Sequence, residues 1–265
     1  MYMSQDSEPY TTKGHYRTWF YFSVKGVPTN HTLTFVIRNM NNQGTLYRAG
    51  LKPVYRVLPK TSKRWKRVPG SVDFGKGEEG YQVTFCHTFS EEAAQDETYY
   101  FAFSYPYSLE ESLKASQRML KKYQDSETIY FHKEILALSL ENRPMELLTI
   151  TGRDHKLMQD REQLIEGLFP YHDGESEVRP FIINKPTVFL TARVHPGETP
   201  ASYVLNGILN FILNEKSEQA QILRDRFVFK VIPILNPDGV YRGYYRHDTK
   251  NQNLNRYYLE PTQEE

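Results

Sequence analysis

The sequence is poor in cysteine and contains no long apolar run. Cys86 is the only cysteine among 265 residues, which excludes an internal disulfide and favours a reducing compartment. The apolar runs are far shorter than the roughly 20 residues that span a bilayer. Residues 1–8 lack the basic start and the apolar centre of a signal peptide. We therefore expect a soluble protein in the cytoplasm.

The sequence also lacks a charge excess of either sign. Its 33 Lys and Arg residues nearly balance 32 Asp and Glu residues, for a net charge of +1. No overall field then attracts nucleic acid or a membrane, and neither is expected as a partner. The basic segment 60–67 is interpreted as a solvated loop, with contact to an acidic partner as the alternative.

The N-terminal part of the sequence is rich in residues that favour β-strands. Residues 1–15 are polar and expected to be loose. Aromatic and β-branched residues then form four strand-like segments separated by Gly, Pro and Asn turns, at 19–24, 32–37, 81–86 and 99–103. Strand following strand without a helix predicts an antiparallel β-sandwich domain over residues 1–107.

From Ser108 onward helices and strands alternate. Ser108-Leu-Glu-Glu is typical of a helix start and predicts a helix over 109–123. Further segments are predicted as strands at 145–151, 188–194 and 227–232, as a short helix at 160–168, and as either strand or helix at 129–140. The alternation predicts an α/β domain with a mixed or parallel sheet over residues 108–265.

A second helix is predicted to begin at Pro200, with Thr199 as its cap. Its apolar stripe, spaced three and four residues apart, is interpreted as ordinary core and comprises Ala201, Val204, Leu205, Ile208, Phe211 and Ile212.

The strand 188–194 ends in His195-Pro196-Gly197-Glu198, which places an imidazole and a carboxylate on a tight turn. Ligands of open α/β sheets bind at the carboxyl ends of strands, and both side chains are good zinc ligands. The spacing alone is weak, because His172 and Glu175 share it in a polar stretch interpreted as a solvated loop. Taken alone, His195 and Glu198 fit a hydrogen-bonded strand-end pair equally well.

Arginines follow the Asn-Pro-Asp-Gly segment at 236–239, namely Arg242, Arg246 and Arg256. A guanidinium holds a carboxylate through two parallel hydrogen bonds, so they suggest an anionic substrate. A fixed positive charge would also stabilise the oxyanion of a tetrahedral intermediate. Ordinary surface charge is the alternative interpretation for each arginine.

Three motifs in this order resemble the zinc metallocarboxypeptidases. They are Arg-Val-His-Pro-Gly-Glu-Thr-Pro at 193–200, Leu-Asn-Pro-Asp-Gly-Val at 235–240 and Asn-Leu-Asn-Arg at 253–256. They are most similar to the cytosolic carboxypeptidases that trim polyglutamate from tubulin, as are Trp19-Phe20-Tyr21-Phe22 and Tyr105-Pro106-Tyr107. The resemblance implies a metallocarboxypeptidase-like mixed sheet behind the β-sandwich, a zinc ion, and glutamate-rich tails, tubulin included, as partners. It leaves association with microtubules or the nucleus open.

Position by position, the resemblance makes His195 and Glu198 zinc ligands. Arg246 matches the arginine that polarises the scissile carbonyl and steadies its oxyanion. Asn255 and Arg256 match the pair that grips the terminal carboxylate of the substrate. Arg242 receives no role, and Asn253 stands where many relatives carry an aspartate that orients the zinc-binding histidine.

The family takes its third zinc ligand, a histidine, and its general-base glutamate from later in the chain. No match occurs in this sequence: His247 lies between the arginines, and Glu260, Glu264 and Glu265 fall in a polar tail. We therefore expect the front portion of an enzyme, without turnover of its own. The alternatives are a zinc amidohydrolase of N-acyl amino acids and a non-catalytic binder of glutamate-rich tails.

Overall fold

A computed structural model of the chain describes residues 1–7, 16–59, 64–89, 97–153, 157–171 and 179–259. Its contacts group the chain into two compact units, Met1–Pro106 with Gly243–Glu265, and Tyr107–Arg242. The contacts place the C-terminal segment with the first unit, whereas the division predicted at residue 107 stays a prediction.

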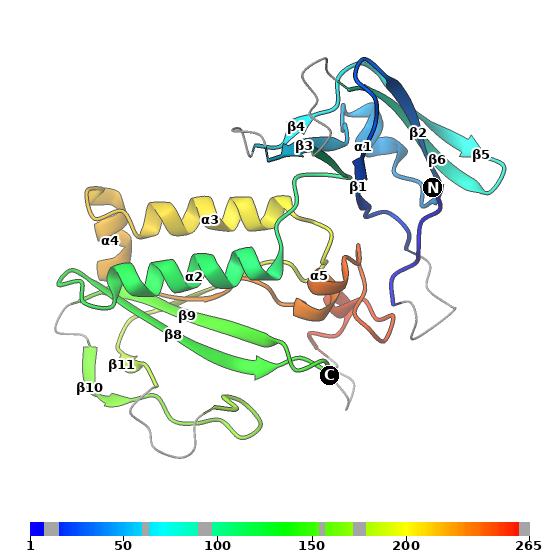
Figure 1. The fold of residues 1–265 in the computed structure, drawn as a ribbon. Coiled ribbons are helices and arrows are strands. Elements are labelled where there is room, and N and C mark those ends of the chain that lie inside the picture. The colour runs from blue at the N-terminus through cyan, green and yellow to red at the C-terminus, as the bar shows by residue number, and fades with distance from the viewer. Residues whose placement is uncertain (8–15, 60–63, 90–96, 154–156, 172–178, 260–265) are drawn as a thin grey trace. The chain divides into compact units, whose positions relative to one another are not determined.

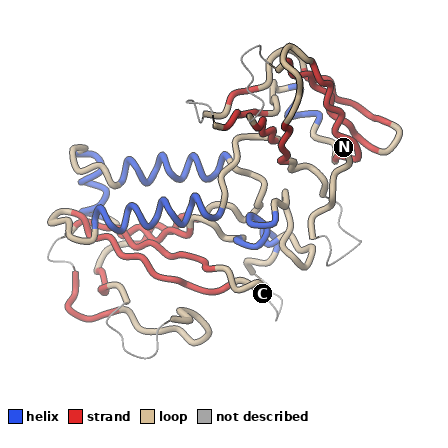
Figure 2. The backbone as a smooth tube through the Cα atoms, viewed as in Figure 1, coloured by secondary structure: helices blue, strands red, loops and turns tan. Residues whose placement is uncertain are grey.

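Two antiparallel sheets build the first unit (Figure 2). One sheet has the order β1-β7-β3-β4 and consists of Tyr21–Lys25, Thr98–Ala102, Val54–Leu58 and Lys66–Arg67. The other has the order β2-β6-β5 and consists of Thr32–Met40, Gly80–Thr88 and Val72–Gly77, with helix α1 at Gly44–Arg48. Aromatic rings from both sheets, including Phe85 and Phe101, form the core between them. The predicted antiparallel sandwich is confirmed.

The sequence-based expectations for this unit were incomplete at two places. β3, β4 and β5 were not predicted, because they are short or carry Lys and Gly residues that are infrequent in strands. The expected looseness of residues 1–15 is wrong for Asp6, whose residue surface is only 4% exposed. Residues 8–15 and 60–63 lie outside the described residues.

The second unit contains a four-stranded mixed sheet of order β12-β13-β9-β8, formed by Thr187–Thr191, Val228–Ile232, Pro144–Gly152 and Ile129–Leu138. β12 and β13 are parallel, and the remaining pairs are antiparallel. The helices are α2 at Leu109–Tyr123, α3 at Pro200–Ile212, α4 at Glu218–Arg226 and α5 at Pro237–Arg242. A separate hairpin pairs β10, Leu157–Arg161, with β11, Phe181–Ile183. The predicted α/β class with a mixed sheet is confirmed.

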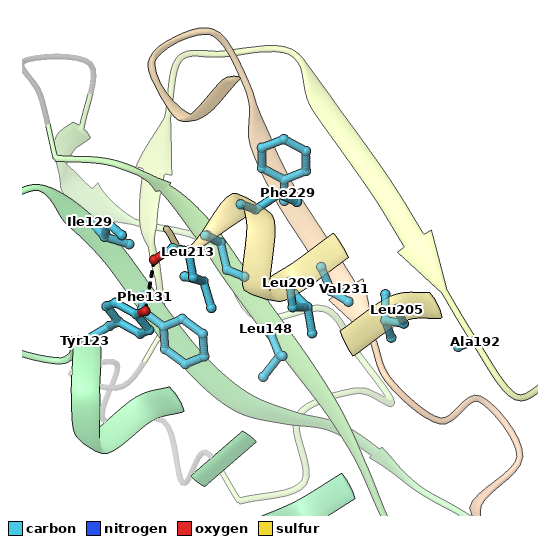
Figure 3. Packing of buried hydrophobic residues seen from close by; sticks show 12 residues of the cluster. Tyr123, Ile129, Phe131, Leu148, Ala192, Leu205, Leu209, Leu213, Phe229 and Val231 are labelled. Atoms are coloured by element: carbon cyan, nitrogen blue, oxygen red, sulfur yellow. Dashed lines mark hydrogen bonds between the residues drawn. The ribbon is translucent and has the colours of Figure 1, made fainter. Parts of the chain in front are cut away.

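Helices α2 and α3 run side by side in the same direction over one face of this sheet (Figure 1). Leu205 and Leu209 of α3 pack on Leu148 and Val231 of the sheet (Figure 3). At the far end of the two helices, the Tyr123 hydroxyl donates a hydrogen bond of 2.9 Å to the Leu213 carbonyl. The two helices therefore form one layer that packs on this face of the sheet.

Local signals explain where the two helices begin. Ser108 and Glu111 form a reciprocal capping box, with the Ser108 side chain accepting from the Glu111 N–H at 3.1 Å. α3 begins at Pro200 as predicted. However, Thr199 has helical dihedral angles and its side chain makes no cap hydrogen bond, so the prediction of a side-chain cap is wrong.

In this unit the structure settles one open alternative and overturns two predictions. Residues 129–138 form a strand, and the helix predicted at 160–168 is absent because 157–161 forms β10 and a loop follows. The strand predicted at 188–194 is β12, which ends at Thr191 and lies at the edge of the sheet among the described residues. The apolar stripe of α3 is only half core: Leu205 and Ile212 are buried, whereas Val204 is 63% exposed, because periodicity does not tell which apolar face is covered.

The described part of the chain contains no helix with the length and apolar composition needed to cross a membrane.

The second unit also contains a cluster of ion pairs. The Arg179 guanidinium pairs with Glu134 and Glu162, and Lys230 pairs with Glu162 at 2.6 Å. These ion pairs hold the segment around Phe169 against the sheet. The helix layer and this cluster thus leave the carboxyl ends of β12 and β13 as the place where loops can form a site.

Candidate metal centre

The turn at the carboxyl end of β12 brings the imidazole of His195 and the carboxylate of Glu198 together. His195 Nδ1 and Glu198 Oε1 lie 3.1 Å apart. The His195 side chain is 7% exposed and that of Glu198 is 48% exposed. The Glu198 N–H also donates to the His195 carbonyl at 3.3 Å, which closes the turn. The imidazole nitrogen and the carboxylate oxygen therefore lie within hydrogen-bond distance of each other.

This separation suits a zinc ion. Zinc bonds of 2.0–2.2 Å in a tetrahedral arrangement place two ligand atoms about 3.3 Å apart. An imidazole nitrogen and a carboxylate oxygen are two of the three donor types that zinc takes in proteins. Among the described residues no group of three His, Cys, Asp or Glu side chains could hold a metal ion. His195 and Glu198 thus fit as part of a zinc ligand set.

Arg193 holds this turn in place. Its Nε donates to the Pro196 carbonyl at 2.9 Å, and its Nη2 donates to the same oxygen. Its Nη1 donates to the Tyr107 carbonyl and to Ser202 Oγ, each at 2.9 Å. Burial lowers the pKa of Arg193 to about 10, so the group stays cationic at neutral pH. The guanidinium joins the turn to the starts of α2 and α3.

The Asn-Pro-Asp-Gly segment supports the turn from its other side. Because β12 and β13 are parallel, their carboxyl ends lie at one edge of the sheet. The Leu235 N–H donates to the Ala192 carbonyl at 2.9 Å, and the Asn236 N–H donates to the Arg193 carbonyl at 3.2 Å. Asn236 Oδ1 accepts from the Gly239 N–H at 2.9 Å, which fixes the start of α5. The two motifs are therefore in direct contact.

Asp238 and Arg242 form hydrogen bonds with the turn between β8 and β9. Asp238 accepts from the Arg143 guanidinium at 2.7 Å and from Ser139 Oγ at 2.6 Å, at the turn between β8 and β9. Arg242 donates to Glu141 of the same turn at 2.7 Å. Arg242, which received no role from the sequence, is thus part of an ion-pair network with Glu141.

Arg246 is held through its backbone. The Asp6 carboxylate accepts from the N–H groups of Tyr245, Arg246 and His247, at 2.8, 2.7 and 3.0 Å. Burial raises the pKa of Asp6, while these three N–H groups act in the opposite direction. The Arg246 guanidinium lies 5.6 Å from the centre of the Tyr16 ring. The first unit therefore fixes the backbone of the segment that carries this arginine.

Asn255 and Arg256 lie on a short 3-10 turn at Leu254–Arg256. Asn253 Oδ1 accepts from the Asn255 N–H at 3.2 Å and caps this turn. The Arg256 side chain is exposed, and its Nη1 donates to the Asn255 carbonyl at 3.0 Å.

His247 is buried, and its Nδ1 pairs with Asn251 Oδ1 at 2.7 Å. The structure thus brings His195 and Glu198 together in the second unit, and describes Arg246, Asn255 and Arg256 in the first.

Sequence reasoning missed the roles of Arg193 and Asp6. Arg193 has a φ of +60°, which is uncommon for a residue other than glycine. No pattern in the sequence predicts this conformation. Asp6 lies in a polar stretch without periodicity, and its partners are 239 to 241 residues away. The second His-x-x-Glu pair, His172 and Glu175, and Glu260, Glu264 and Glu265 lie outside the described residues.

Two protein families match this chain. Residues 116–262 match the family described as Zinc carboxypeptidase, and residues 1–104 match the one described as Cytosolic carboxypeptidase N-terminal domain. The chain belongs to the zinc carboxypeptidase family, in its cytosolic carboxypeptidase branch.

Among its relatives, Cytosolic carboxypeptidase-like protein 5 of Homo sapiens is 43% identical over 254 residues. That alignment covers 92% of this chain and 28% of the relative. Cytosolic carboxypeptidase 6 of Mus musculus is 35% identical, over 96% of this chain and 42% of its own length. The chain therefore spans well under half the length of the relatives it matches.

Solved structures support the fold. A metallo-carboxypeptidase from Burkholderia cenocepacia superimposes with a TM-score of 0.67 at 22% identity, covering 94% of this chain and 55% of that chain. A metallo-carboxypeptidase from Pseudomonas aeruginosa gives a TM-score of 0.66 at 22% identity, covering 94% and 54%. At this identity the likeness establishes the fold alone.

Proposed function

We propose that the protein is a zinc metallocarboxypeptidase that removes glutamates, C-terminal or on side chains, from acidic tails such as those of polyglutamylated tubulin. The observation that carries the proposal is the 3.1 Å pair of His195 Nδ1 and Glu198 Oε1 at a strand end, in a member of the zinc carboxypeptidase family. The choice of acidic tails rests on the resemblance of the motifs at 193–200, 235–240 and 253–256 to the carboxypeptidases that trim polyglutamate. The names of the relatives support a cytoplasmic site of action.

Each residue has a part in this proposal. His195 and Glu198 would hold the zinc ion, which when bound supplies a water of lowered pKa and polarises a carbonyl group. Arg193 keeps the two donors at one place by fixing the turn between them. We assign Arg246 to the scissile carbonyl, because a fixed cation favours the developing oxyanion. Asn255 and Arg256 are assigned to the terminal carboxylate of the substrate.

The test uses a grafted enzyme, in which residues 1–259 of this chain replace the matching segment of the human relative. Its release of free glutamate from a peptide ending in glutamates is measured by mass spectrometry. We expect release that a zinc chelator abolishes. His195→Ala and Glu198→Gln should also abolish it, because the first removes a metal donor and the second replaces an anionic carboxylate by a neutral amide.

The matched control is Glu218→Gln, the same change on an exposed carboxylate at the start of α4. It should leave glutamate release unchanged. Binding of the peptide by the grafted enzyme without any release would contradict the proposal. The 265-residue chain alone is expected to release no glutamate, and chelator-sensitive release from it would contradict that expectation.

A non-catalytic binder of glutamate-rich tails is the second candidate. It is favoured by one observation: in the described ranges only two zinc donors converge, and no group of three exists. Zinc affinity separates the candidates, because an enzyme of this family requires tight binding and a binder does not. The amidohydrolase alternative is not favoured, since residues 1–104 match a domain of the cytosolic carboxypeptidases.

A further inference from the structure

The two parallel helices of the second unit enclose a groove that the proposed reaction does not use. It has a volume of about 590 Å³ and lies between α2 and α3. Tyr107 and Tyr203 close one end with their rings 5.6 Å apart, and Tyr123 and Leu209 lie along its length. Because Arg193 bonds the Tyr107 carbonyl, this end adjoins the turn of His195 and Glu198.

One wall of the groove is a row of cations. Lys114, Arg118 and Lys122 are exposed, line the groove and follow one another at intervals of four residues along α2. Lys122 is fixed over the groove, with its Nζ 2.7 Å from the Tyr123 hydroxyl and 4.6 Å from the ring centre. The row is therefore ordered at one end.

Three carboxylates lie near this row. Glu215 attracts Lys122 electrostatically and accepts hydrogen bonds from Ser126 and Thr128. Glu111 is the acidic residue that lines the groove, and its carboxylate accepts the Ser108 N–H at 2.7 Å in the capping box. Lys114 pairs with Glu110 at 2.5 Å, but both side chains are largely exposed, so this pair is weak and exchangeable. Among the residues that line the groove, three cations therefore stand against one carboxylate.

The opposite wall suits a peptide backbone. Asn206 and Asn210 of α3 line it, again four residues apart. An amide side chain can accept from a backbone N–H and donate to a carbonyl, which is what an extended peptide requires on its edge. The groove thus offers cations on one side and amides on the other.

The spacing of the cations selects an extended ligand. Positions four residues apart on a helix are separated by about 6 Å along its axis. In an extended peptide alternate side chains lie on one face, about 6.8 Å apart. Carboxylates at every second residue of an extended acidic peptide would therefore meet the three cations in register.

We propose that this groove is a second binding site, for an extended acidic peptide segment, separate from the metal centre. The choice of an acidic peptide over other anions rests on the proposed function, whereas the site itself rests on the charge and spacing of its walls. Bound there, an acidic tail lies along α2 and α3 and passes the end of the groove that adjoins the His195 turn.

The experiment measures binding and not catalysis. A labelled peptide of about eight residues, alternating Glu and Gly, is acetylated at its N-terminus and amidated at its C-terminus, which removes the terminal carboxylate. Its affinity for the 265-residue chain is measured by fluorescence anisotropy. The variant K114Q/R118Q/K122Q is expected to weaken binding about tenfold, the sum of three exposed ion pairs.

The matched control variant is K121Q/K216Q/R226Q, which removes three exposed cations that do not line the groove. Its affinity for the peptide should fall by less than about twofold, because distant surface charges are screened by salt. An equal loss in both variants would overturn the site in favour of diffuse attraction. Both variants are checked for folding by circular dichroism and thermal unfolding.

Two further ligands complete the test. A peptide of the same composition with Glu in adjacent pairs should bind severalfold more weakly, and equal affinity would overturn the extended pose. A single-stranded oligonucleotide of equal charge should bind more weakly than the alternating peptide, and tighter binding would overturn the choice of occupant.

If the grafted enzyme released no glutamate, the expected binding of the amidated peptide to the groove would be unaffected. The amidated peptide should bind His195→Ala and wild-type chains equally, whether or not the grafted enzyme releases glutamate.

Discussion

The guanidinium of Arg193 donates two hydrogen bonds to the carbonyl of Pro196, inside the turn that carries His195 and Glu198. Arg193 itself has a positive φ of +60°. The left-handed backbone at Arg193 changes the direction of the chain after β12. The Arg193 side chain then reaches the Pro196 carbonyl in the turn that follows. One residue therefore determines both the direction of the turn and its rigidity.

Replacing Arg193 separates these two effects. Arg193→Ala leaves the carbonyls of Pro196 and Tyr107 without their donor, and we expect it to lower the free energy of unfolding by about 3 kcal/mol. Arg193→Gly loses the same hydrogen bonds but relaxes the left-handed backbone, so it should be about 1 kcal/mol less destabilising than the alanine variant.

Urea denaturation followed by fluorescence measures both values. Arg226→Ala, at the exposed end of α4, is the control and should change stability by no more than about 0.5 kcal/mol. If the alanine variant were as stable as the wild type, the turn would not depend on Arg193.

The sequence predicted the parts of this site that depend on residue order. The turn after a β-branched strand and the helix from Pro200 follow from local chemistry, and both are confirmed. The anchoring by Arg193 does not follow from order, because its partner Tyr107 is 86 residues away. Contacts of this length are set by packing and cannot be read from periodicity.

Asp6 provides a second prediction, for the segment that carries Arg246. Its carboxylate accepts three backbone N–H groups, two of them on Oδ2. Asp6→Asn places an amide NH2 where one of these donors points, so at least one buried N–H loses its acceptor. We expect a loss of about 2–3 kcal/mol in unfolding free energy, measured by urea denaturation.

The control is Asp73→Asn on an exposed position of β5. It should be neutral within about 0.5 kcal/mol. Equal effects of the two changes would show that the hydrogen bonds of Asp6 to residues 245–247 add nothing to the stability.

His87 predicts a pH dependence of stability. It is buried among the rings of Tyr55, Phe89, Tyr99 and Phe101, and burial lowers its pKa from 6.5 to about 4. The folded chain holds the neutral ring while the unfolded chain takes up a proton below pH 6.5. Stability is therefore complete above that pH and falls as the pH drops toward 4, by at most about 3 kcal/mol.

His87→Phe removes this titration and keeps the aromatic packing. The free energy of unfolding of this variant should change less between pH 6.5 and 4 than that of the wild type. His31→Phe, at an exposed turn position, is the control and should retain the wild-type slope. An unchanged slope in His87→Phe would mean that other groups produce the acid sensitivity.

The exposed residues of α3 show the limit of pattern-based reasoning. The stripe was read as core because the spacing of Val204, Ile208 and Phe211 matches a buried helix face. In the structure these three side chains are exposed, and Leu205, Leu209 and Ile212 form the packed face. Periodicity identifies an amphipathic helix, but only the position of the sheet decides which face is covered.

Arg246 is expected to act in the reaction and not in binding. In the grafted enzyme, Arg246→Ala should lower kcat by about 100-fold or more with a small change in KM, because the cation acts on charge that develops in the transition state. Steady-state glutamate release measures both constants. A rise in KM alone would place Arg246 in ground-state binding instead.

Arg256 gives the complementary prediction. Its guanidinium is exposed at the end of the 3-10 turn, where it can grip a terminal carboxylate through two parallel hydrogen bonds. Lysine keeps the charge but not the two-pronged geometry, so Arg256→Lys in the grafted enzyme should raise KM by about tenfold and change kcat little. Arg226→Lys is the matched control and should leave both constants unchanged. If Arg256→Lys lowered kcat at constant KM, the arginine would act on the transition state, and the terminal carboxylate would have to be bound by other residues.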